Sequence, residues 1–150
     1  MAQSLSKVYI HCIFHVKDEK RTIRTEDENE LYAYIGGMIK EISSHPIIIN
    51  GTANHIHILA TLSKNISLSA FIKKIKENSS RWIKTKGVNY KDFEWQGGYS
   101  GYSVSHSKIN AVEKYIANQK EHHKKVSFRD EYITFIKECG IELDESLLWA

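Results

Sequence analysis

The sequence predicts an α+β fold with the ferredoxin-like split β-α-β arrangement, an antiparallel four-stranded sheet with helices on one face. Two observations lead to this fold class. Short stretches with the two-residue alternation of strands are separated by longer stretches with the period of amphipathic helices. Their order is β-α-β-β-α-β-α followed by a terminal helix, and the first six elements match the split β-α-β order.

Residues 7–16 form the first expected strand, because apolar side chains alternate along it. Its core face would carry Val8, Ile10, Cys12, Phe14 and Val16. Its other face would carry Tyr9, His11, Ile13 and His15. This mixed second face is typical of a strand that is half buried.

The first helix is expected from Thr25 to about Ser43. Thr25 and Glu28 have the spacing of a capping box, in which each side chain satisfies a backbone N–H of the first turn. Apolar residues then recur at helical spacing and would face the core: Leu31, Ile35, Met38 and Ile42.

The middle of the chain contains a second strand around residues 47–49 and a third at residues 55–60, joined by a turn at residues 51–54. Alternation along the third strand sends Ile56 and Ile58 into the core. His55 and His57, which alternate with these isoleucines, must therefore point to the opposite face of the sheet.

Three helices and one strand complete the order. Ser67 can cap a second helix over residues 68–86, and residues 101–105 form the fourth strand. A third helix is expected over residues 108–125, and a serine can cap a last helix over residues 127–139. The core side of the second helix would carry Leu68, Phe71, Ile72, Ile75, Trp82 and Ile83. This arrangement leaves one face of the sheet free for a site or a partner subunit.

Size and composition fit one globular domain over residues 1–150. Hydrophobic residues make up 41% of the chain and charged residues 26%, and the net charge of +3 permits a nucleic-acid partner without requiring one. No apolar run is long enough for a membrane span, and no signal peptide is visible. The two cysteines form no metal-binding cluster, and this usage indicates a cytoplasmic location.

The sequence His55-Ile56-His57 is the strongest candidate for chemistry. In a strand the two histidines point the same way, with Cα atoms about 6.6 Å apart, so both imidazoles can reach one metal ion. The alternative is a pair of hydrogen-bonded surface histidines, which is common for so short a motif.

A second candidate pair lies on the third helix. Tyr115 and Gln119 are four residues apart and share a helix face. The phenol oxygen can serve as a nucleophile, and the amide oxygen can complete a metal site with two imidazoles. Such a site leaves open positions for a phosphate oxygen. Taken alone, this pair could equally be a half-buried tyrosine and an exposed glutamine.

Together these residues resemble the HUH single-tyrosine transposases of bacterial insertion sequences that move as single-stranded DNA, the IS200-like transposase family. His55-Ile56-His57 resembles the HUH motif, and the segment from Tyr115 to Gln119 resembles the Tyr-x-x-x-Gln helix. The resemblance covers nearly the whole chain. It also includes Trp95-Gln96, Gly98-Tyr99-Ser100, Tyr102-Ser103-Val104-Ser105, Gln119-Lys120-Glu121-His122-His123, Phe128, Glu131-Tyr132, Gly140-Ile141 and Asp144-Glu145.

The resemblance implies a DNA strand transferase in which Tyr115 forms a 5′-phosphotyrosine link and releases a 3′-hydroxyl. It implies that His55, His57 and Gln119 hold Mg²⁺ or Mn²⁺. It further implies a homodimer and a single-stranded DNA partner with a hairpin at each element end. In some members the tyrosine helix of one subunit completes the site of the other. This chain has Asn54 where many relatives carry an aspartate, a change that would tune metal affinity without removing a ligand.

Other polar residues are candidates for supporting roles. A second layer around the metal could include Asn54, His11, His122 and His123, although a polar helix end and surface packing also explain the last three. DNA contacts could come from Lys73, Lys76, Arg81 and Lys84, or by base stacking from Tyr99 and Tyr102. The basic residues could equally form an ordinary solvated helix face.

Three other functions deserve comparison. A histidine-triad nucleotide hydrolase needs a third histidine at position 59, where this chain has Leu59. A non-catalytic ferredoxin-like module would bind single strands without metal and without a covalent product. A domesticated transposase acting on repeated extragenic palindromes would share the same residues and differ only in its genomic context.

Overall fold

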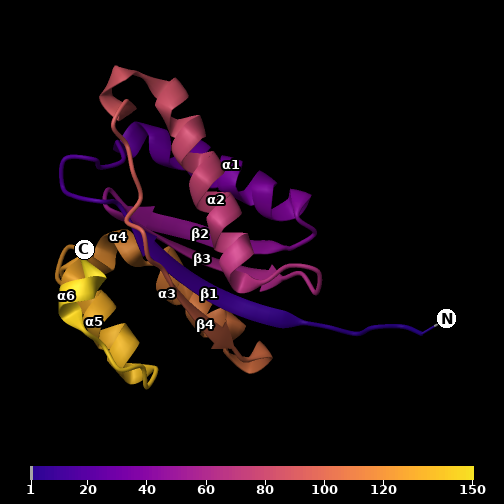
Figure 1. Cartoon of the computed structure of the whole chain (residues 1–150). Helices are drawn as coiled ribbons and strands as arrows, with labels where there is room; N and C mark the ends of the chain where they lie inside the picture. The colour runs from indigo at the N-terminus through magenta and orange to yellow at the C-terminus, as the bar shows by residue number, and fades with distance from the viewer. Residues whose placement is uncertain (1) are drawn as a thin grey trace.

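The computed structural model describes residues 2–150 and contains an antiparallel four-stranded sheet with helices on both faces (Figure 1). The strands follow the order β2-β3-β1-β4, which is the order of the ferredoxin-like split β-α-β arrangement. Their bounds are β1 Val8–His15, β2 Pro46–Thr52, β3 His55–Leu62 and β4 Ser100–Val104. The predicted fold class is confirmed.

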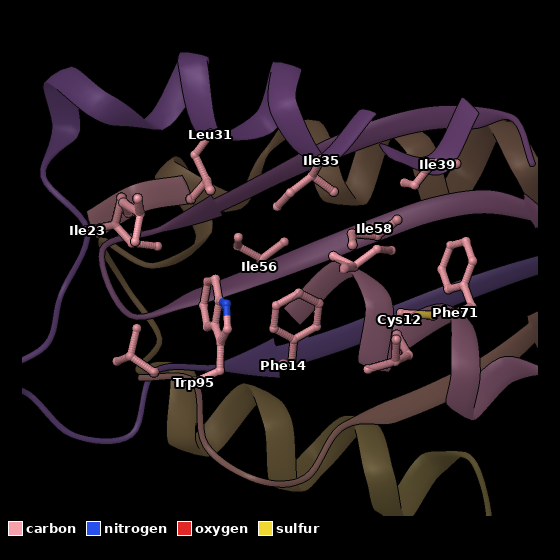
Figure 2. Close-up of a cluster of buried hydrophobic side chains, with 14 of the residues drawn as sticks. Cys12, Phe14, Ile23, Leu31, Ile35, Ile39, Ile56, Ile58, Phe71 and Trp95 are labelled. Carbon is pink, nitrogen blue, oxygen red and sulfur yellow. The ribbon is translucent and has the colours of Figure 1, made fainter. Parts of the chain in front are cut away.

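Two long helices cover the first face of the sheet, α1 (Glu28–Glu41) and α2 (Leu68–Ile83) (Figure 1). The apolar residues of β1 and β3 point toward them, as the alternation predicts. Figure 2 shows this core, which includes Cys12, Phe14, Ile56, Ile58, Leu31, Ile35, Ile39 and Phe71. Burial on this face leaves the intervening histidines of the same strands on the other face.

The second face is not free, contrary to the expectation from sequence. It is covered by the C-terminal part of the chain, which forms α3 (Ile109–Ala117), α4 (Gln119–His122), α5 (Phe128–Glu138) and α6 (Glu145–Leu148) (Figure 1). A second apolar cluster packs α5 against the sheet and consists of Ile13, Tyr102, Phe128, Tyr132 and Ile136. The apolar side chains of α5 are buried by packing against the mixed face of β1, which carries Ile13.

Several helix ends differ from the predictions. Thr25 does not cap α1; it begins a 3-10 turn, and the structure shows no side-chain cap there. The third helix is broken at Asn118, whose ψ of 11° ends α3 and separates it from α4. Ser67 and Ser127 do cap α2 and α5, accepting hydrogen bonds from backbone N–H groups. No helix within residues 2–150 is long and apolar enough to cross a membrane.

The hairpin between β2 and β3 places the histidine pair. Thr52 pairs with His55, and Asn50 pairs with His57 across the ladder. On the other side of β3, His55 lies beside His15. Both histidines therefore sit in the centre of the sheet, where β2 and β1 flank them.

Gly51 is required by the close approach of the two strands at this hairpin. A Cβ atom added at Gly51 would overlap the backbone carbonyl of His55, and backbone cannot move aside as a flexible side chain can. We expect Gly51→Ala to lower the free energy of unfolding by about 1–3 kcal/mol, the usual cost of overpacking. Chemical denaturation measures this loss. Gly97→Ala is the matched control, because an added Cβ there meets nothing within 4 Å, and equal stability of the two variants would contradict the prediction.

Candidate active site

His55 and His57 begin β3 and are fully buried on the face that α3, α4 and α5 cover. Their ring centroids lie 5.1 Å apart. Burial is the main cause that lowers the pKa of both imidazoles, in the case of His55 well below the usual value. Both rings are therefore neutral at physiological pH, which is the protonation state in which imidazole binds a metal.

Each histidine is oriented by a partner at its Nδ1 atom. The amide oxygen of Asn54 lies 2.8 Å from Nδ1 of His55, and the Thr52 hydroxyl donates to the same oxygen at 3.0 Å. Nε2 of His11 lies 2.8 Å from Nδ1 of His57. His11 is itself buried, not a surface residue, and burial lowers its pKa to about 3. Such contacts fix the orientation of each ring, as partners of metal-bound histidines commonly do.

Gln119 and Tyr115 meet the histidine pair from the helical layer. The amide oxygen of Gln119 lies 2.8 Å from Nε2 of His55, and the whole side chain is buried. The Tyr115 ring packs against the His57 ring with centroids 5.8 Å apart. Burial is the first cause that raises the pKa of Tyr115, and its hydrogen bond to a carboxylate adds to the effect. The structure thus brings together the four predicted residues within one chain.

That carboxylate belongs to Glu131 of α5, which was not singled out as a site residue from sequence. Its side chain is 4% exposed, and its two oxygens contact both halves of the site. One signal was available: Glu131 falls within the apolar stripe of α5, which otherwise consists of Phe128, Tyr132, Phe135 and Ile136. A charged residue on a buried stripe needs partners, since an unpaired buried charge is costly.

His123 and His122 also lie at the site. Nε2 of His123 is 2.9 Å from the amide oxygen of Gln119 and 3.1 Å from Oε1 of Glu131. Its contacts with Glu131 raise the pKa of His123 even though burial, the first contribution, lowers it. Nε2 of His122 lies 3.2 Å from the other oxygen of Glu131.

The arrangement of lone pairs fits a bound divalent cation. Nδ1 of His55 faces an amide oxygen, which can only accept, so the neutral ring carries its proton there and keeps a lone pair at Nε2. The amide nitrogen of Gln119 donates to Glu131 at 2.9 Å, so its oxygen faces His55. Two acceptor atoms are therefore held 2.8 Å apart without a proton between them. A cation bound by both atoms removes the repulsion. The amide oxygen suits Mg²⁺ or Mn²⁺, whereas imidazole is a typical ligand of transition-metal ions.

An open groove of about 540 Å³ borders the residues that surround the site. Asn54, His123 and Phe128 line the groove on the side of the site. Two lysines, Lys120 and Lys124, line it together with two glutamates, Glu19 and Glu28, and Lys120 is paired with Glu28 at 3.0 Å. His55 and His57 do not line the groove and are fully buried behind this wall.

The proposed DNA contacts on α2 lie far from this groove. Lys73, Arg81 and Lys84 belong to or follow the helix that covers the opposite face of the sheet. Lys76 instead donates to the backbone carbonyls of Gln96 and Gly98, at 2.6 and 2.9 Å, and its half-burial follows from these contacts. The structure does not bring these residues to the candidate site.

The two tyrosines proposed for base stacking differ in exposure. Tyr102 is buried and packs against Phe135 with ring centroids 4.7 Å apart, so its ring has no free face for a base. Tyr99 is 39% exposed on the segment before β4. Of these two tyrosines, Tyr99 alone presents its ring to solvent.

Solved transposase structures share this fold. One is described as a transposase from Deinococcus radiodurans R1; it is 18% identical, with a TM-score of 0.60 over 79% of this chain and 98% of that structure. Another is a REP-associated tyrosine transposase bound to a REP hairpin; it is 15% identical, with a TM-score of 0.61 over 100% of this chain and 90% of that structure. No curated protein sequence matches the chain.

The sequence family agrees with the shared fold and assigns the chain to the transposases. The family described as "Transposase IS200 like" matches residues 4–119, which include the histidine pair, Tyr115 and Gln119. The chain therefore belongs to the IS200-like transposase family. Its matched region ends before α5, so the contacts of Glu131 lie outside it.

Proposed function

We propose that this transposase cleaves and rejoins single-stranded DNA with Tyr115 as the nucleophile and a divalent cation as cofactor. The observation that carries the proposal is the convergence of a tyrosine hydroxyl and a histidine–histidine–glutamine set at one buried point beside an open groove. A tyrosine near buried neutral imidazoles suits attack on phosphorus better than it suits simple strand binding.

The Tyr115 oxygen attacks the scissile phosphorus as its O–H proton passes to the carboxylate of Glu131, which accepts its hydrogen bond. A bond forms between the phosphorus and the tyrosine oxygen, and the bond to the 3′-oxygen of the preceding nucleotide breaks. The products are a 5′-phosphotyrosine and, after the leaving oxygen takes up a proton, a free 3′-hydroxyl. The phosphodiester energy is kept in the covalent link, so attack by a 3′-hydroxyl reseals the strand without a nucleotide cofactor.

His55, His57 and Gln119 would hold the cation, Mg²⁺ or Mn²⁺. When bound, it supplies positive charge that offsets the charge developing on the phosphate in the transition state. Asn54 and His11 orient the two imidazoles through their Nδ1 atoms, which keeps both Nε2 atoms directed to the site. His123 is a further group at the site that can meet a phosphate oxygen.

The DNA partner we propose is a single strand with a hairpin at each element end, in line with the hairpin-bound transposase that shares the fold. The groove beside Lys120 and Lys124 would take the strand, and Tyr99 could stack on an unpaired base. We further propose that residues 1–150 act as one domain and that two copies form a homodimer. Each copy would contain its own complete set of site residues.

Covalent trapping tests the proposed function. The protein is incubated with labelled single strands from both flanks of its own gene, with Mg²⁺, Mn²⁺ or a chelator, and resolved on a denaturing gel. We expect a protein–DNA adduct with either ion and none with the chelator. Tight binding of these strands without any adduct would instead indicate a non-catalytic binding module.

A further inference from the structure

We propose that Glu131 is a carboxylate ligand of the divalent-cation site and that its second oxygen holds the hydroxyl of Tyr115 beside the cation. The inference rests on the proposed function, since it concerns the same cation. It adds α5 to the active site, although α5 lies beyond residues 4–119 that the family shares.

The carboxylate of Glu131 is removed from water, since only 4% of its side chain is exposed. Ring nitrogen atoms of four histidines lie within 3.8 Å of its two oxygens: His55, His57, His122 and His123. A buried carboxylate needs partners, and a carboxylate and several imidazoles gathered at one point can share a divalent cation.

The first oxygen of Glu131 faces the histidine pair. Oε1 lies 3.3 Å from Nε2 of His57 and 3.8 Å from Nε2 of His55. These three donor atoms lie within 4.8 Å of one another, and the Gln119 oxygen is 2.8 Å from Nε2 of His55. Neighbouring ligands of an octahedral ion with bonds of roughly 2.1 Å lie about 3 Å apart. The carboxylate oxygen is thus spaced as a fourth ligand.

The second oxygen of Glu131 holds the two predicted residues of the third helix. Oε2 accepts a hydrogen bond from the Tyr115 hydroxyl and another, of 2.9 Å, from the Gln119 amide nitrogen. The second bond decides which way the Gln119 amide is turned, so its oxygen faces His55. One carboxylate therefore places a ligand of its own, orients a second ligand and positions the nucleophile.

The competing interpretation is that Glu131 only accepts hydrogen bonds from the site and leaves when a cation enters. The two interpretations predict opposite effects of Glu131→Gln, which keeps the size of the side chain and removes its charge. If Glu131 is a ligand, the substitution weakens metal binding. If Glu131 only blocks the site, the substitution leaves metal binding unchanged or makes it tighter.

The test is a titration of the full-length protein with Mn²⁺, followed by calorimetry and by the electron paramagnetic resonance of free Mn²⁺. We expect Glu131→Gln to weaken Mn²⁺ binding at least about tenfold. Glu138→Gln, an exposed glutamate on the same helix, is the matched control and should bind as the wild type does. Wild-type affinity or tighter binding in Glu131→Gln overturns the proposal.

Hydrogen exchange of the wild-type protein decides the matter if Glu131→Gln does not fold. Mn²⁺ should slow amide exchange in α5 if a residue of that helix binds the ion, and unchanged exchange in α5 overturns the inference. The proposed function is judged separately through His57→Ala. If Glu131→Gln binds Mn²⁺ normally and His57→Ala does not, only the role of Glu131 as a ligand is refuted. If the wild-type protein binds no Mn²⁺, both this inference and the proposed cation cofactor are refuted.

Discussion

Tyr115→Phe should abolish the covalent protein–DNA adduct, a loss on the order of 10⁴-fold or more in cleavage rate, as for other covalent nucleophiles. The hydroxyl oxygen is the only atom removed, and the proposed intermediate cannot form without it. The ring would keep its packing against His57 and Phe135, whose centroids lie 5.8 and 6.1 Å away. Quantitative denaturing gels with a single labelled strand measure the loss.

The same variant should still bind Mn²⁺ and single-stranded DNA, because Tyr115 is not a proposed metal ligand. This separates a lost nucleophile from a lost fold or a lost substrate. Tyr34→Phe is a matched control, since Tyr34 of α1 stacks on Trp82 of α2, and these helices cover the face of the sheet opposite the site. An adduct of normal yield in Tyr115→Phe would falsify the assignment of the nucleophile.

The parts of the site that follow from local periodicity could be predicted from sequence. Alternation along a strand directs His55 and His57 to one face, and the structure places both on the face opposite Ile56 and Ile58. Spacing of four on a helix directs Tyr115 and Gln119 to one side, and both reach the same carboxylate despite the break at Asn118. These relations hold within one element and need no knowledge of the tertiary fold.

The contribution of Glu131 could not be derived in that way. It is 74 residues from His57, and the two meet only because α5 packs over the second face of the sheet. That packing follows from Ile13 and Tyr102 on the sheet, which form an apolar cluster with residues of α5. In the sequence, Ile13 lies on the mixed face of a half-buried strand, and Tyr102 is a candidate for base stacking. Long-range packing of this kind decides which charged residue joins a site.

The break in the third helix was hidden for a related reason. Asn118 carries neither the fixed φ of proline nor the freedom of glycine, so no strong breaker marks the position. Its side chain lies on the exposed side, while Asn50 of β2 donates at 2.9 Å to the carbonyl of Ile116 just before it. This hydrogen bond from the sheet satisfies a carbonyl group at the end of α3. Helix propensity, which depends on the local sequence, does not predict such a tertiary contact.

His57→Ala should weaken Mn²⁺ binding by more than about 100-fold, because removing a ligand costs at least as much as removing the partner that orients one. Metal-dependent cleavage should fall with it at limiting Mn²⁺. The substitution leaves Nε2 of His11 without its 2.8 Å partner and Oε1 of Glu131 without its 3.3 Å partner, so the fold must be checked by circular dichroism.

Titration of cleavage against Mn²⁺ distinguishes a lost ligand from a damaged fold. If His57 is a ligand, the rate of His57→Ala should recover in part as Mn²⁺ is raised, because the remaining ligands still bind the ion weakly. His45→Ala is the matched control, since His45 is exposed before β2 and only its backbone is hydrogen-bonded. Cleavage by His57→Ala at the wild-type rate and the wild-type Mn²⁺ dependence would show that the ion is bound elsewhere. The histidine pair would then only position Tyr115.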